Sequence, residues 1–224
     1  MKVLVISAHP DDETLGCGGA LLKHKADGDA LFWIIVTQPH GPQWSAKIIK
    51  RKEREIDRVS EAYGIKKYFK LRFLATKLDK VPQVDLIDRI RTAISKIKPE
   101  LVYLVHGGDI HTDHQAVFGA TMSVLKPFYL SRLGVRRILC YETLSSTDAA
   151  PPLSNQTFIP NVFTNITNYI EQKIKIMKLY QTEIQKDPLP RGSSAIQALA
   201  RYRGATIGAK YAEAFMLIRE LTQK

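Results

Sequence analysis

Short apolar segments that alternate with amphipathic segments constrain the fold of this chain more than any other feature. Runs rich in β-branched or aromatic residues predict strands at 2–6, 31–37, 68–73, 101–105 and 137–141. The amphipathic segments predict helices at 20–26, 45–63, 82–98, 113–125, 168–185 and 194–201. Strands that are apolar throughout are typical of a parallel sheet buried between helices. The sequence therefore predicts an α/β fold with a Rossmann-like, mainly parallel sheet and helices on both faces.

The remaining segments favour one domain in a reducing compartment. Residues 144–160 contain Pro151-Pro152 and predict a loop, and 215–221 predicts a closing strand or helix. At 224 residues, we expect 1–224 to form a single α/β domain. Two cysteines are too few for a disulfide framework. The longest apolar run, 31–36, is too short to span a membrane, and acidic residues follow 3–6 too closely for a signal peptide, so we expect a cytoplasmic protein without a membrane partner.

Two clusters of metal-binding residue types follow two of the predicted strands. Ala8-His-Pro-Asp-Asp-Glu13 follows the first strand, and His106-Gly-Gly-Asp-Ile-His-Thr-Asp-His114 follows the strand 101–105. In open α/β sheets, ligands bind beyond the carboxyl ends of the strands. Catalytic zinc sites use three protein ligands, usually imidazoles and carboxylates, and leave a position for water. Two histidines and a carboxylate from these neighbouring loops meet that requirement.

Two other kinds of site fit the sequence less well. The glycines at 16, 18 and 19 do not have the spacing of a dinucleotide-binding loop, and they lie too far beyond the first strand. They predict close packing of a helix against the sheet instead. No G-x-S-x-G motif is present, and Cys17 has no basic residue near it in the sequence, so a serine or cysteine nucleophile is disfavoured.

The first cluster, Ala8-His-Pro-Asp-Asp-Glu13, together with His111-x-x-His114, resembles the PIG-L/LmbE family of zinc-dependent N-acetylglucosaminyl deacetylases. The segment 203–215 is similar to the closing segment of that family. The resemblance implies that His9, Asp12 and His114 bind Zn²⁺. It also implies that Asp11 is the general base and that His111 supports the oxyanion and protonates the leaving amine. Asp113 would orient an imidazole, and either Tyr202 or Tyr211 would contact the oxyanion.

The chemistry of these residue types agrees with hydrolysis of an amide. A bound zinc ion polarises a carbonyl and lowers the pKa of its water from about 15.7 toward 7. A carboxylate can then take a proton from the water, and a histidine can give one to the departing nitrogen. We therefore expect a zinc-dependent hydrolase that removes an N-acetyl group from an N-acetylglucosamine-type amino sugar or its conjugate. The alternative is a non-hydrolytic nucleotide- or nucleic-acid-binding α/β protein.

Positive charge is concentrated in one part of the chain. The formal net charge is +11, and residues 47–77 contain eleven basic and four acidic residues. Arg51, Arg54 and Arg58 recur at helical spacing and predict a stripe that could line a pocket for an anionic substrate. A solvated helix face is an equal alternative. Aromatic residues are sparse in this helix, which disfavours a nucleic-acid partner. The sequence leaves a homo-oligomer open.

Overall fold

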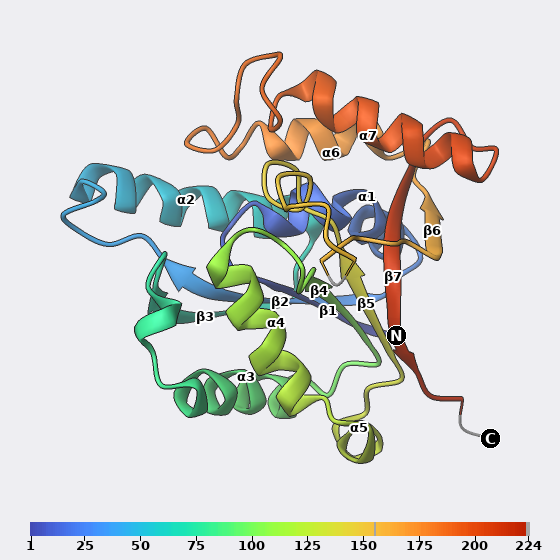
Figure 1. Cartoon of the computed structure of the whole chain (residues 1–224). Helices are drawn as coiled ribbons and strands as arrows, with labels where there is room; N and C mark the ends of the chain where they lie inside the picture. The colour runs from blue at the N-terminus through green and yellow to red at the C-terminus, as the bar shows by residue number, and fades with distance from the viewer. Residues whose placement is uncertain (155, 223–224) are drawn as a thin grey trace.

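The computed structural model describes residues 1–154 and 156–222 and contains a seven-stranded sheet (Figure 1). Its strands are β1 (Lys2–Ser7), β2 (Ala30–Gln38), β3 (Lys67–Leu74), β4 (Leu101–Val105), β5 (Arg137–Tyr141), β6 (Val162–Asn165) and β7 (Ala212–Glu220). Their order across the sheet is β3-β2-β1-β4-β5-β7-β6. The pairs among β1 to β5 are parallel, whereas β7 is antiparallel to both β5 and β6. The predicted mainly parallel α/β sheet is therefore confirmed.

Helices cover both faces of this sheet, as predicted (Figure 1). One layer contains α1 (Asp12–Ala26), α2 (Ala46–Tyr63), α6 (Ile170–Met177) and α7 (Ser193–Thr206). The other contains α3 (Gln83–Ile97), α4 (Thr112–Val124) and α5 (Pro127–Leu133), and a short 3₁₀ helix, η1, spans Leu78–Lys80. The central strands lie between the two layers, so residues on both sides of β1 and β4 are buried. This double burial explains why these strands are apolar throughout.

Several elements differ from the prediction. Helix α1 begins at Asp12 and continues across a kink at Cys17, although the glycine-rich segment suggested a start near residue 20. A Cβ atom at Gly16 would overlap the ring of Tyr141, so the glycine allows this helix to lie directly against the sheet. This agrees with the close packing that the glycines at 16, 18 and 19 predict. Helix α5 and strand β6 were not predicted, and the closing segment predicted at 215–221 is a strand, β7, which begins at Ala212 and ends at Glu220.

The predicted helix 168–185 is wrong beyond Met177, where α6 ends. Tyr180 is buried in the core, and its hydroxyl donates a hydrogen bond to Glu13 Oε1 (2.7 Å). The following segment, 181–192, contains Pro188 and Pro190 and crosses to α2, where Gln181 and Glu183 contact side chains of that helix. The contacts of Tyr180 with the core and of Gln181 and Glu183 with α2 are made by residues beyond the end of α6, so tertiary packing overrides the local helical pattern.

Two further points follow from the elements. None of the helices in the described part of the chain has the length and apolar composition that crossing a membrane requires. The sheet order reverses direction between β1 and β4, which are neighbours although α1, β2, α2, β3 and α3 separate them in the sequence. Open α/β sheets bind ligands at this kind of switch point, beyond the carboxyl ends of the strands.

Candidate active site

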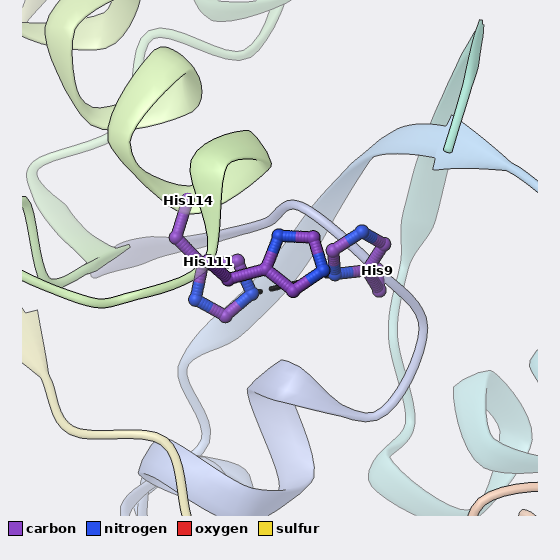
Figure 2. Close-up of side chains that lie close together, drawn as sticks. All are labelled: His9, His111 and His114. Atoms are coloured by element: carbon purple, nitrogen blue, oxygen red, sulfur yellow. Dashed lines mark hydrogen bonds between the residues drawn. The ribbon is translucent and has the colours of Figure 1, made fainter. Parts of the chain in front are cut away.

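A cavity of about 580 Å³ lies at the switch point between β1 and β4. Both polar clusters identified in the sequence contribute to its wall, through His9, Asp11 and Asp12 after β1 and through His111 and His114 after β4. Figure 2 shows the three imidazoles converging from these two parts of the chain. The fold therefore brings together residues that lie about a hundred positions apart, as the parallel sheet predicted.

The atoms of His9, Asp12 and His114 are spaced as a small cation requires. His114 Nε2 lies 3.3 Å from His9 Nδ1, the contact dashed in Figure 2, and 3.3 Å from Asp12 Oδ1. His9 Nδ1 lies 3.8 Å from Asp12 Oδ2. Tetrahedral zinc with bonds of about 2.0–2.2 Å separates its ligand atoms by roughly 3.3–3.5 Å. His114 Nε2 lies at this spacing from both other predicted ligands, and His9 lies slightly farther from the second oxygen of Asp12, so the three side chains are compatible with a shared divalent cation.

His111 is the third imidazole in this cluster. Its ligand atom and those of His9 and His114 all lie within 4.8 Å of one another, and its ring stacks on that of His114 with centroids 4.9 Å apart. Its Nδ1 accepts a hydrogen bond from the backbone N–H of Asp113 (3.2 Å) at the start of α4. Its Nε2 is therefore the nitrogen left to face the cavity. Burial and the neighbouring imidazoles lower the pKa of His111 to about 4.

Two buried carboxylates orient the histidines. Asp113 Oδ2 lies 2.9 Å from His9 Nε2, and the same side chain accepts hydrogen bonds from the backbone N–H groups of Thr76 and Leu78. Asp109 Oδ2 lies 3.0 Å from His114 Nδ1. Carboxylates of this kind fix the ring orientation and tautomer of histidines that bind metals. Asp113 lies where the prediction requires. Sequence reasoning missed Asp109, although it lies within the second cluster.

The two adjacent aspartates have opposite electrostatic environments. Burial alone would raise the pKa of Asp12, but the imidazoles of His114 and His9 lower it well below its usual range. Burial would lower the pKa of His114, but Asp12 and Asp109 raise it to about 10. For Asp11, burial and the charge of Asp12 raise the pKa to about 8. A divalent cation bound next to Asp11 would oppose that rise.

Asp11 has an unusual backbone conformation and a cationic partner. Its φ of 121° lies in the left-handed region, which typically costs a non-glycine residue about 1–3 kcal/mol. This conformation lets the chain turn into α1 immediately after Asp11, so the carboxylates of Asp11 and Asp12 reach different partners. Arg191 Nη1 lies 3.4 Å from Asp11 Oδ2 and 2.9 Å from Glu183 Oε2.

The rim of the cavity contains residues that sequence reasoning did not identify. Lys52 pairs with Glu183, and burial lowers the pKa of this lysine. Other parts of the wall are apolar (Trp44 and Ile48) or carry hydroxyl groups (Thr143, Ser145 and Ser146). These residues come from α2, from the loop before it and from the segments after β5 and α6, so no local motif in the sequence connects them.

The predicted substrate-binding residues lie outside this cavity. Arg51, Arg54 and Arg58 line a separate groove, whereas Ile48 and Lys52 of the same helix line the cavity. Adjacent residues such as Arg51 and Lys52 project about 100° apart around a helix, so they reach different surfaces.

The structure brings neither predicted tyrosine to the histidines. Tyr202 is 66% exposed on α7, and Tyr211 is buried just before β7, where its hydroxyl accepts a hydrogen bond from Gln197 Nε2 (2.8 Å). No tyrosine is among the described residues that line the cavity.

Comparisons with known proteins agree with this geometry. The family model described as PIG-L, GlcNAc-PI de-N-acetylase, matches residues 4–125. The diacetylchitobiose deacetylase of Thermococcus kodakarensis is 26% identical to the chain, and the match covers 97% of the chain and 83% of that protein.

Two solved structures have the same fold. The conserved protein TT1542 from Thermus thermophilus matches with a TM-score of 0.77 and 25% identity, covering 99% of this chain and 96% of that one. The N,N'-diacetylchitobiose deacetylase from Pyrococcus horikoshii matches with a TM-score of 0.77 and 19% identity, covering 97% of this chain and 83% of that one. At that identity, the second match supports the fold alone.

The family match carries the most weight, because it spans more than half of the chain and includes both polar clusters. The cavity at the switch point contains the histidines and aspartates of these clusters in contact with one another. The chain belongs to the PIG-L family, and it is an N-deacetylase, a hydrolase that acts on an amide.

Proposed function

We propose that the protein uses Zn²⁺ to remove the N-acetyl group from an N-acetylglucosamine-type amino sugar or a conjugate of one. The observation that carries this proposal is the spacing of His9 Nδ1, Asp12 and His114 Nε2, next to Asp11 and His111. Imidazole nitrogen and carboxylate oxygen are ligands that zinc prefers. The names of the matching family and of the Thermococcus relative, which refer to acetylated amino sugars, also support it.

In this proposal, His9, Asp12 and His114 hold the ion. When bound there, zinc would polarise the amide carbonyl and make water a stronger nucleophile at neutral pH. Asp109 and Asp113 would keep the two imidazoles oriented, since each accepts a hydrogen bond from the ring nitrogen that does not face the metal.

The remaining steps fall to Asp11 and His111. Asp11 would take a proton from the attacking water, because its carboxylate lies in the cavity and is not among the proposed metal ligands. His111, neutral with Nδ1 accepting from the backbone, would donate a hydrogen bond from Nε2 to the developing oxyanion. The proton that Asp11 took from water would pass to the departing nitrogen as the C–N bond breaks, which releases acetate and a primary amine. Positioned acids and bases of this kind typically contribute about 10²–10⁴-fold to the rate.

The wall of the cavity suits a sugar. Its volume lies within the range of about 300–1,000 Å³ that is usual for small-molecule sites. Trp44 and Ile48 offer an apolar surface to one face of a ring. Thr143 and Arg191 add a hydroxyl and a guanidinium group to the wall, and both kinds of group can bind hydroxyl groups of a substrate.

The direct test is to incubate the zinc-loaded protein with diacetylchitobiose and with other N-acetylated sugars and to measure free acetate. We expect acetate release that stops when a chelator removes the metal and returns when zinc is added. Acetate release that persists after complete metal removal would contradict the proposed role of zinc. Absence of release from every acetylated sugar would contradict the proposed substrate class.

A further inference from the structure

A basic groove of about 270 Å³ lies on α2, distinct from the active-site cavity. Four cations line it (Lys47, Arg51, Arg54 and Arg58), together with Glu55 and Gln181. The cations follow one another at intervals of four, three and four residues, so they share one side of the helix. Like charges at this spacing repel one another. Among the described residues, Glu55 is the single acid in the groove wall.

Two of the other three acids of α2 point away from this set of cations, and the third, Glu61, makes no ion pair with them within the described residues. Asp57 accepts a hydrogen bond from the hydroxyl of Tyr68, and Glu53 lies 3.9 Å from Lys70 Nζ, so both are directed toward β3. The side chains of Lys47, Arg54 and Arg58 make no hydrogen bond or ion pair within the described ranges, 1–154 and 156–222. These three cations are therefore available to an external anion.

The groove and the cavity share a wall, because three consecutive residues after α6 contact α2. Gln181 accepts a hydrogen bond from Arg51, and Thr182 Oγ1 donates one to Glu55 Oε2 (2.8 Å). Glu183 pairs with Lys52. Gln181 faces the groove, whereas Thr182, Glu183 and Lys52 line the cavity. The segment 181–183 therefore separates the groove from the cavity, with one hollow on each side of it.

We infer that the groove binds the anionic group, phosphate or carboxylate, of an amino-sugar conjugate whose acetamido sugar occupies the cavity. This inference rests on the proposed function. Arginine guanidinium groups bind phosphate and carboxylate oxygens through paired hydrogen bonds, and Arg54 and Arg58 are the two arginines free to do so. Arg51 is engaged with Gln181 and lies 3.4 Å from Glu55.

The test compares a groove variant, Arg54→Gln/Arg58→Gln, with a control variant, Lys96→Gln/Lys126→Gln. Both remove two positive charges, and the control lysines are exposed, on α3 and just before α5. For UDP-N-acetylglucosamine, we expect kcat/KM of the groove variant to fall by about tenfold or more, since charge-assisted hydrogen bonds are lost. Diacetylchitobiose, which is neutral, should be hydrolysed at an unchanged rate by both variants.

Calorimetric titration of the zinc-loaded variants with inorganic phosphate at low salt tests the groove without turnover. We expect weaker binding in the groove variant than in the control. Equal binding in both variants, or equal losses of kcat/KM for the two substrates, would overturn the inference while leaving the proposed function intact. Phosphate binding that depends on Arg54 and Arg58, without hydrolysis of any acetylated sugar, would instead support the groove and contradict the proposed function.

Discussion

At the scale of single residues, the pair Asp11 and Asp12 shows how neighbouring carboxylates take different roles. Helix α1 begins between them, and the left-handed φ of Asp11 directs the two side chains to different partners. Asp12 lies against His9 and His114, whereas Asp11 lies near Arg191. Residue type alone does not distinguish these two adjacent acids; the family resemblance assigns their roles, and the backbone geometry gives a physical reason for the difference.

This difference predicts the behaviour of two matched variants. Asp11→Asn should retain zinc and lose about 10²–10⁴-fold in kcat, because an amide cannot accept the proton from water. Asp12→Asn should lose zinc, because it removes a charged ligand. Metal analysis of the purified variants and assays of acetate release check both outcomes. If Asp11→Asn lost the metal and Asp12→Asn kept it, the two roles would have to be exchanged.

Asp109, which sequence reasoning missed, supports a second prediction at this scale. It is fully buried and contacts His114 Nδ1, the backbone N–H of His111 and the hydroxyl of Thr147. Asp109→Asn keeps its shape and removes its charge, so we expect zinc affinity to fall by about 10–100-fold, as is typical for such supporting carboxylates. Competition with a chromogenic chelator measures this change. Asp79→Asn, a variant away from the cavity lining, should bind zinc as the wild type does.

At the scale of elements, α1 depends on a buried ion pair formed by Lys173 and Glu213. Glu213 accepts hydrogen bonds from the backbone N–H groups of Gly19 (2.8 Å) and Ala20 (2.7 Å), just after the kink at Cys17. Lys173 Nζ donates to Leu15 O (2.8 Å), just before the kink, and lies 2.7 Å from Glu213 Oε1. The pair therefore stabilises both halves of the helix that carries Asp12.

Breaking this pair should destabilise the protein. Glu213→Gln leaves the charge of Lys173 buried without its partner, so we expect the free energy of unfolding to fall by about 3–5 kcal/mol. Urea denaturation measures the change. The double variant Lys173→Met/Glu213→Gln removes both charges and should recover part of the loss, which a double-mutant cycle quantifies. Additive effects of the two single substitutions would contradict the coupling.

The elements also show which features local sequence patterns can predict. The predicted end of α2 at Tyr63 is confirmed, and Gly64 follows it with a φ of 69°. This end could be predicted because a glycine after the helix and an apolar stripe along it are local signals in the sequence. Strand β6 has four residues and is defined by its pairing with β7, so no local pattern identifies it. The same limit applies to the site: His9 and His114 lie in motifs, whereas Lys52, Glu183 and Arg191 converge through the crossing of residues 181–192 over α2.

At the scale of the whole molecule, the sheet order explains why residues from distant parts of the chain meet at one site. The histidines and aspartates of the proposed metal site follow the parallel strands β1 and β4 at the centre of the sheet, and the segments after β5 and α6 complete the rim of the cavity. Strands from residues 2 to 220 form one continuous sheet, which supports the prediction that 1–224 is a single domain. A single domain should unfold in one cooperative transition. The homo-oligomer remains a prediction that light scattering can check.

The metal site should be coupled to this global transition. An ion that binds the folded state alone stabilises it by about 2.7 kcal/mol at a free concentration one hundred times its Kd. For a chain of this length, that corresponds to a rise in Tm of roughly 5–10 °C. Differential scanning calorimetry of metal-free protein with and without added zinc measures the shift. His114→Ala should abolish the shift because it removes a ligand, whereas Arg54→Gln, in the groove on α2, should retain it.

An unchanged Tm in the wild type on adding zinc would favour a protein that does not bind a metal at this site. An equal shift in His114→Ala would place the bound zinc elsewhere in the molecule.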